Sequence, residues 1–153
     1  MRYPLGLCLA GLVGCAASTE VVPPINEAAL DVQVLADAAR YRPLYAVVVR
    51  VHNRSDETVY ENRCDGSLEG FGFIPGQWNG SYGSARVCLF DAGQAPTGPG
   101  FLAIAPGASV VDTFFVNSQA YAGQWRVRLD LRDADNDPLP LARRVSAAFT
   151  VEP

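Results

Sequence analysis

The alternation of apolar and charged residues from Trp125 to Arg132 constrains the fold more than any other stretch of the sequence. Trp125, Val127, Leu129 and Leu131 alternate there with Arg126, Arg128, Asp130 and Arg132. A β-strand sends successive side chains to opposite faces, so this period of two predicts a strand with one buried side and one solvated side. The run from Tyr45 to His52 has the same period. Both runs favour a sheet whose inner face builds a core.

Turn signals at short spacing divide the rest of the chain. The 14 glycines and 11 prolines fall largely between short apolar segments, and no stretch keeps a helical period. Seven or eight strands at such spacing predict an all-β, antiparallel two-sheet sandwich over residues 30–153. Its length suits a single domain. The glycine-rich segment from Asp65 to Gly83 is expected to form a long loop or a ragged hairpin.

The N-terminus reads as an export signal. One positive charge at Arg2 precedes an apolar segment, Leu5 to Val13, that is far shorter than the roughly 20 residues of a membrane span. The segment ends in Leu12-Val13-Gly14-Cys15, which resembles the bacterial lipobox. The resemblance implies that residues 1–14 are a lipoprotein signal peptide, that Cys15 carries a lipid and that residues 15–29 form a flexible tether. The expected location is the cell envelope. Because Ala16 is not Asp, this would be the outer membrane, facing the periplasm, in a Gram-negative host.

This organisation predicts a role for each of the four cysteines. Cys8 leaves with the signal peptide and Cys15 takes the lipid, so Cys64 and Cys88 remain as one pair in an exported protein. A disulfide between them is expected, with two reduced buried thiols as the alternative. Closing a loop of this length would stabilise the fold by roughly 3 kcal/mol in the chain-entropy model.

The charge of the chain excludes some classes of partner. A net charge of −4 and a pI near 4.9 argue against nucleic acid, whose phosphates require a basic surface. The outward arginines of the 125–132 strand, with Arg144 expected on the neighbouring strand, suggest either a patch for an anionic partner or an ordinary solvated sheet face.

The segment from Asp65 to Gly83 supplies the candidate recognition residues, Phe71, Phe73, Trp78 and Tyr82. Aromatic side chains on a loop of a rigid sandwich make good anchors for a partner. The same side chains could instead fold back and cap one end of the core. The sequence leaves both interpretations open.

Other polar runs predict no catalytic, metal or cofactor site. Asp133 to Asp137 spaces carboxylates as calcium loops do, but Pro138 and Arg144 stand where an EF-hand needs Gly and Glu, so a hairpin turn is favoured. His52 is the only histidine, and no GxSxG motif is present. A surface histidine on a strand is therefore expected.

Short motifs are spread over residues 30–151: Val51-His52-Asn53-Arg54-Ser55, Thr58-Val59-Tyr60 before Cys64, Trp78 in a glycine-rich stretch, Cys88, Ala105-Pro106-Gly107, Gly123-Gln124-Trp125-Arg126-Val127 and the closing segment from Val145 to Val151. Together they resemble a group of small exported bacterial lipoproteins that carry one immunoglobulin-like domain. The resemblance implies a fold but no activity. A weaker resemblance is to bacterial proteinase-inhibitor sandwiches of the intracellular type, from which the export signal and the cysteine pair depart.

The function expected from these features is non-enzymatic. The chain would be a lipid-anchored envelope protein whose sandwich binds or scaffolds a protein or glycan partner. Its N-terminal lipid would attach it to the membrane. The alternative is an inhibitor in which the segment from Asp65 to Gly83 blocks an envelope protease. A hydrolase using His52 as base is a third hypothesis.

Overall fold

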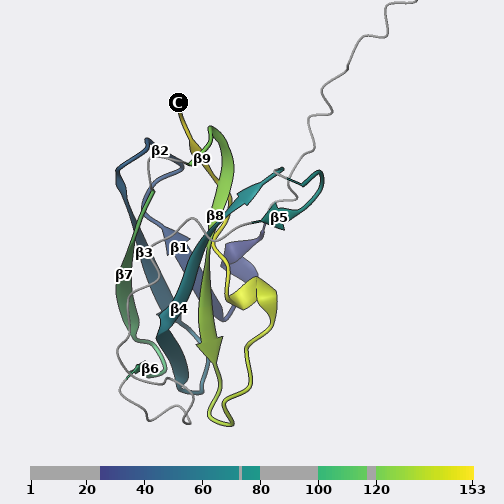
Figure 1. The fold of residues 1–153 in the computed structure, drawn as a ribbon. Coiled ribbons are helices and arrows are strands. Elements are labelled where there is room, and N and C mark those ends of the chain that lie inside the picture. Colours follow the sequence, from purple (N-terminus) through teal and green to yellow (C-terminus); the bar gives the residue numbers. More distant parts are fainter. Residues whose placement is uncertain (1–24, 73, 80–99, 117–119) are drawn as a thin grey trace, which may run out of the picture.

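Two β-sheets face one another across a shared core in the computed structural model, which describes residues 25–72, 74–79, 100–116 and 120–153 (Figure 1). Nine strands lie in these ranges, three in one sheet and six in the other. The predicted all-β, two-sheet architecture is confirmed, with one correction. The sheets are mostly antiparallel, but one pair of strands, β2 and β9, is parallel.

The small sheet contains β1 (Val32–Ala36), β3 (Ala46–Asn53) and β7 (Ser109–Phe115), in the order β1-β3-β7. Every neighbouring pair is antiparallel. The strand β3 is the run from Tyr45 to His52 whose period of two predicted it, and β-branched valines suit its half-buried surface. Its inward residues Val47, Val49 and Val51 are completely buried.

The large sheet follows the order β2-β9-β8-β4-β5, with β6 also paired to β4. Its strands are β2 (Arg40–Tyr41), β4 (Val59–Phe71), β5 (Trp78–Asn79), β6 (Phe101–Ile104), β8 (Gly123–Arg132) and β9 (Phe149–Val151). The strand β8 carries the alternation that predicted it, and its apolar side chains all face the core with at most 2% exposure. The last strand is shorter than predicted, because Val145 and Ser146 form only isolated bridges, to β8 and β1.

A bulge interrupts β4. Asn62 lies opposite Asp130 and Ser67 lies opposite Arg128, so residues 63–66 face the single residue Leu129. The surplus of residues shifts the alternation, and the outward positions change from even numbers before the bulge to odd numbers after it. In the described part of the segment from Asp65 to Gly83, this confirms the hairpin, one of the two expected forms, but part of the segment is regular strand. Its first part continues β4 to Phe71, and only then does a hairpin lead to β5.

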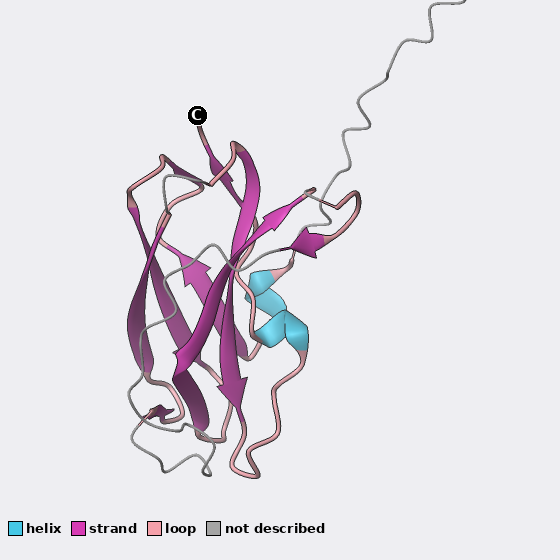
Figure 2. Cartoon of the chain, viewed as in Figure 1, coloured by secondary structure: helices cyan, strands magenta, loops and turns pink. Residues whose placement is uncertain are grey.

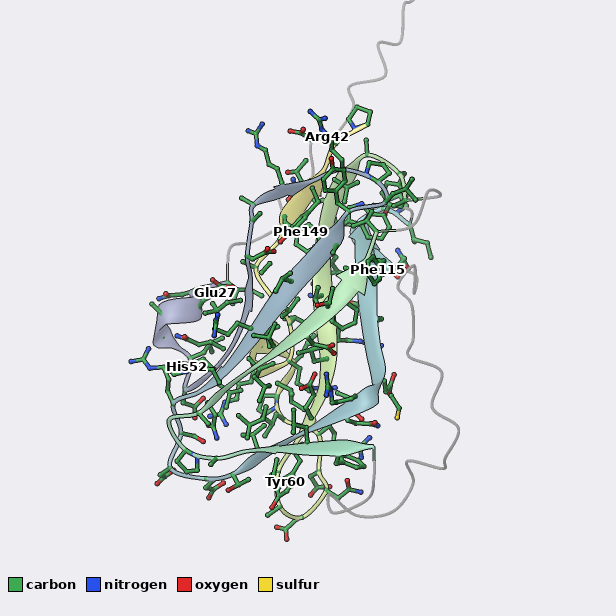
Figure 3. The ribbon with its side chains drawn as sticks, turned by 90° about the vertical axis from the view of Figure 1, so that its left-hand side faces the viewer. Glu27, Arg42, His52, Tyr60, Phe115 and Phe149 are labelled. Atoms are coloured by element: carbon green, nitrogen blue, oxygen red, sulfur yellow. The ribbon has the colours of Figure 1, made fainter. Side chains whose placement is uncertain are left out.

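Side chains from both sheets form one hydrophobic core. Trp125 and Phe149 are its largest members from the large sheet, and each is nearly completely buried. Figure 3 views the molecule from the side of the small sheet, with Phe149 between the layers. Burying a side chain of this kind contributes roughly 1.5–3 kcal/mol, so this core stabilises the sandwich.

Helical structure in the described residues is limited to two 3₁₀ turns, η1 (Glu27–Ala29) and η2 (Leu141–Arg143) (Figure 2). Neither is long enough to cross a membrane. The turn η1 lies in the last part of the predicted tether and contacts the sandwich. Its Glu27 carboxylate accepts a hydrogen bond from the Ala147 N–H at 2.9 Å.

Candidate functional site

The outer face of the large sheet collects the charged side chains of β8. Arg126, Arg128, Asp130 and Arg132 point away from the core, and their neighbours across on β4 are Glu69, Ser67, Asn62 and Tyr60 respectively. Cross-strand neighbours on one face are close enough to interact. This face therefore brings together the arginines that the sequence placed outward and a carboxylate, Glu69, that the sequence did not single out.

Glu69 binds two arginines at once. Arg126 donates to its Oε2 through Nε at 2.8 Å and lies 2.7 Å from it through Nη2. Arg128 Nε lies 3.0 Å from Oε1. The side chains of Glu69 and Arg126 are each only 11% exposed. Both carboxylate oxygens are thus occupied, in the paired arrangement that a nearly buried charge requires.

Trp78 covers the guanidinium of Arg126. The Cζ atom of Arg126 lies 4.3 Å from the centre of the Trp78 ring, a cation–π contact. Phe71 lies opposite Trp78 in the pairing of β4 with β5, and the centres of the two rings are 5.2 Å apart. We call Glu69, Phe71, Trp78, Arg126 and Arg128 the Arg126 cluster.

Two of the four predicted recognition residues are therefore placed. Phe71 and Trp78 face one another across β4 and β5, are half-buried and lie outside the core. Phe73 and Tyr82 lie outside the described residues, so their part in recognition or capping stays a prediction. The hairpin also presents Ile74, whose side chain is 47% exposed. An aromatic pair, a charged group and an exposed apolar side chain thus share one short hairpin and its neighbouring strand.

Farther along the face, the charges form a second group. Arg132 Nε donates to both oxygens of Asp130, at 3.1 and 3.0 Å, and Asn62 Nδ2 donates to Oδ2 at 3.0 Å. Arg132 also donates through Nη1 to the carbonyl of Asn136 at 3.1 Å. Asp130 is buried by these contacts. The group links β4, β8 and the turn that follows β8.

His52 lies on the outer face of the small sheet, on β3 (Figure 3), whereas these arginines belong to the large sheet. Its Nδ1 is 2.7 Å from Ser109 Oγ on β7, a neighbour that sequence spacing could not reveal. Catalysis by such a pair needs a third group to orient the histidine. Among the described residues, no carboxylate pairs with His52.

The acidic run from Asp133 to Asp137 forms a turn. Asp133 Oδ1 accepts hydrogen bonds from the N–H groups of Asp135 and Asp137, at 3.0 and 2.9 Å, and Asn136 has a positive φ of 68°. Such bonds from an aspartate to nearby backbone groups are typical of turns. In the part of the chain that the structure describes, no three His, Cys, Asp or Glu residues come together as metal ligands would.

The predicted lipidation and disulfide sites cannot be placed in full. Cys15 and Cys88 lie outside the described residues, whereas Cys64 lies in the bulge of β4. The lipid anchor and the pairing of Cys64 with Cys88 stay predictions.

No known family model matches the chain, and no curated protein matches it.

Proposed function

We propose that this chain is a lipid-anchored protein of the bacterial cell envelope whose immunoglobulin-like sandwich binds a partner and catalyses no reaction. The order of the strands supports the fold assignment. β1, β3 and β7 correspond to strands A, B and E of an immunoglobulin domain, and β4, β8 and β9 correspond to C, F and G. The chain departs from antibody domains in carrying its buried tryptophan, Trp125, on β8 and not on β4.

The Arg126 cluster is the observation that carries the binding proposal. Tryptophan and arginine are the residues most enriched at the centres of protein interfaces, and a fixed aromatic side chain loses little conformational freedom on binding. Here Glu69 orients Arg126, and Arg126 supports the ring of Trp78. The partner would meet a preorganised surface at the β4–β5 hairpin.

A photo-crosslinking amino acid at Gln77 tests this surface in living cells. Gln77 is exposed and adjoins Trp78, and the exposed Asp56 in the turn after β3 is the matched control position. We expect a crosslinked adduct at position 77 that is absent at position 56 and that is lost when Trp78→Ala is added. Equal labelling at the two positions, or labelling that survives Trp78→Ala, would exclude the hairpin as a binding surface.

The anchor is tested separately, because it depends on the sequence of residues 12–15. Metabolic labelling with an alkynyl fatty acid should mark the wild-type chain, and Cys15→Ser should abolish the label and release the protein from membranes. Cys64→Ser serves as the control, since it removes a different cysteine. Continued labelling of Cys15→Ser would contradict the anchor.

The exposed Ile74 near the end of the β4–β5 hairpin favours protease inhibition as a second candidate. An exposed side chain on a short hairpin can enter a protease pocket. Purified protein should then inhibit an envelope protease, and Ile74→Asp should abolish the inhibition. An absence of inhibition across the proteases of the host envelope would eliminate this candidate.

A further inference from the structure

A pocket of about 230 Å³ lies at the other end of the charged face. It is bounded by the bulge of β4, the end of β8 and the segment that precedes β9. Polar side chains dominate its walls: Asp65, Arg128, Asp130, Arg132 and Arg144, with Pro138. We call it the Arg144 pocket.

The pocket is lined by the guanidinium groups of three arginines and by two carboxylates. One of the carboxylates, Asp130, is already paired within the protein. Asp130 accepts hydrogen bonds from Arg132 and Asn62, so its charge is neutralised within the protein. Arg128 contacts Glu69 through Nε, on the side of the Arg126 cluster. Asp65 is exposed to solvent and forms no ion pair with a described residue. Three guanidinium charges against two carboxylate charges leave the lining of the pocket with a net charge of +1.

Arg144 differs from the other arginines of the pocket. Its backbone is held in place, because its carbonyl accepts a hydrogen bond from the Leu129 N–H at 2.8 Å. Its side chain forms no hydrogen bond or ion pair with any described residue, and its Nε is buried without an acceptor. A buried N–H of a charged group without an acceptor is costly and uncommon. An acceptor from outside the chain would bind the Nη groups of the same guanidinium, which form no hydrogen bond with a described residue and are not closed off from solvent.

We propose that the Arg144 pocket binds a phosphate or sulfate group, with Arg144 as the principal donor and Arg128 and Arg132 as flanking donors. The planar guanidinium presents N–H groups in a fork that matches the oxygens of such anions. The volume is below the roughly 300–1,000 Å³ of pockets for drug-sized ligands, which favours a small charged group over a larger molecule. This site is independent of the lipid anchor and of recognition at Trp78. Failure of either of those proposals would leave the test of the Arg144 pocket unaffected.

Calorimetric titration of the full chain with inorganic phosphate and with sulfate, at constant ionic strength, tests the site. Saturable binding is expected, and Arg144→Gln should weaken it by at least about tenfold. Arg143→Gln is the matched control, because the neighbouring Arg143 pairs with Asp31 at 2.8 Å and does not line the pocket. It should change the affinity by less than about twofold.

The source of the anion is distinguished by a second arm. Vesicles of phosphatidylcholine with and without phosphatidylglycerol, and soluble glycerol phosphate, separate a lipid headgroup from a free phosphate ester. Binding that depends on Arg144 in either arm supports the pocket and names its source. Binding in neither arm, or binding that Arg144→Gln leaves unchanged, overturns the proposal.

A measurement on the wild-type protein makes the test independent of whether the Arg144→Gln variant folds. In wild-type protein labelled with ¹⁵N at arginine, the Nε–H signal that is absent from Arg144→Gln should shift on addition of phosphate. A signal that stays in place at saturating phosphate would place the anion elsewhere and also overturn the proposal.

Discussion

The two ends of the charged face use arginine in opposite ways. In the Arg126 cluster, the guanidinium of Arg126 has a carboxylate at its edge and an indole on its face, and it is almost completely covered. In the Arg144 pocket, the guanidinium of Arg144 contacts neither, and a cavity lies in front of it. Arg128 lies between the two, pairing with Glu69 while lining the pocket.

The bulge of β4 accounts for the difference. Where β4 and β8 are in regular register, an outward residue of β4 such as Glu69 lies directly across from an arginine. At residues 63–66 the regular ladder is lost, and Asp65, the acidic residue of β4 that lines the Arg144 pocket, forms no ion pair with Arg144. An arginine that finds its acceptor within the fold stabilises the fold, whereas one that does not remains available to a ligand.

Glu69→Gln should have the largest effect on stability. Removing its charge leaves Arg126 nearly buried without an anionic partner, and breaking a buried ion pair in this way costs about 3 kcal/mol. Urea unfolding followed by circular dichroism measures the loss. The exposed Glu57 gives the control, since Glu57→Gln should change the free energy of unfolding by less than about 0.5 kcal/mol. If the two variants were equally stable, the Arg126 cluster would not be structural.

Trp78→Ala should have the next largest effect, about 1–2 kcal/mol. It removes the cation–π contact with Arg126 and the ring contact with Phe71. Trp78→Phe keeps an aromatic face and should lose less. Ile74→Ala, in the same hairpin but exposed, is the control and should be nearly neutral. A loss for Ile74→Ala as large as that for Trp78→Ala would point to the hairpin as a whole instead of the ring.

Tyr41, on β2 of the same sheet, bonds a carboxylate as Arg126 does, but through a neutral phenol. Tyr41 donates a hydrogen bond to Asp37 Oδ1, and burial together with this bond raises the pKa of Tyr41 above its ordinary value near 10. The folded chain therefore keeps the phenol proton at a pH where the unfolded chain has lost it. The stability that this contributes is present below about pH 10 and decreases as the pH rises further.

Tyr41→Phe should consequently cost about 1 kcal/mol at neutral pH and make stability less sensitive to alkali. Unfolding curves collected between about pH 8 and 11 measure the slope. Tyr45→Phe is the control, because the side chain of Tyr45 is exposed and its removal should leave the slope as in the wild type. A wild-type slope in Tyr41→Phe would assign the alkaline sensitivity to another group.

Arg144→Gln should have the smallest effect on stability, within about 0.5 kcal/mol, because no hydrogen bond or ion pair of its side chain with a described residue is lost. Thermal unfolding without phosphate measures it. Added phosphate should raise the melting temperature of the wild type but not of the variant. A loss comparable to that of Glu69→Gln would show that Arg144 is structural and that the two ends of the face are alike.

The sequence predicted one strand of this face better than the other. β8 alternates without interruption, so its buried and outward residues follow from the period alone. In β4 the phase changes at the bulge, and Glu61 and Leu68 face the core although one number is odd and the other even. A search for a single period therefore finds no strand beyond Cys64, and the sequence predicts only a long loop or a ragged hairpin there.

The sequence did not predict the cross-strand partners either. Glu69 meets Arg126 through a register that depends on the bulge of β4, and Ser109 meets His52 through the register of β3 with β7 in the small sheet. The parallel pairing of β2 with β9 depends on the first part of the chain passing from one sheet to the other. Residue types and local periods do not specify such a crossing.

The bulge of β4 also governs how the length of this chain can change. Four residues stand where regular pairing would have one, an odd surplus of three. Deleting one residue from 63–66 would leave an even surplus of two, so a single uninterrupted alternation would serve both halves of β4, with Glu69 still outward and Leu68 still inward. Deleting two would leave a surplus of one, as in a simple bulge, and the change of phase would remain. The length of the chain can therefore change at this point without turning either half of β4 over.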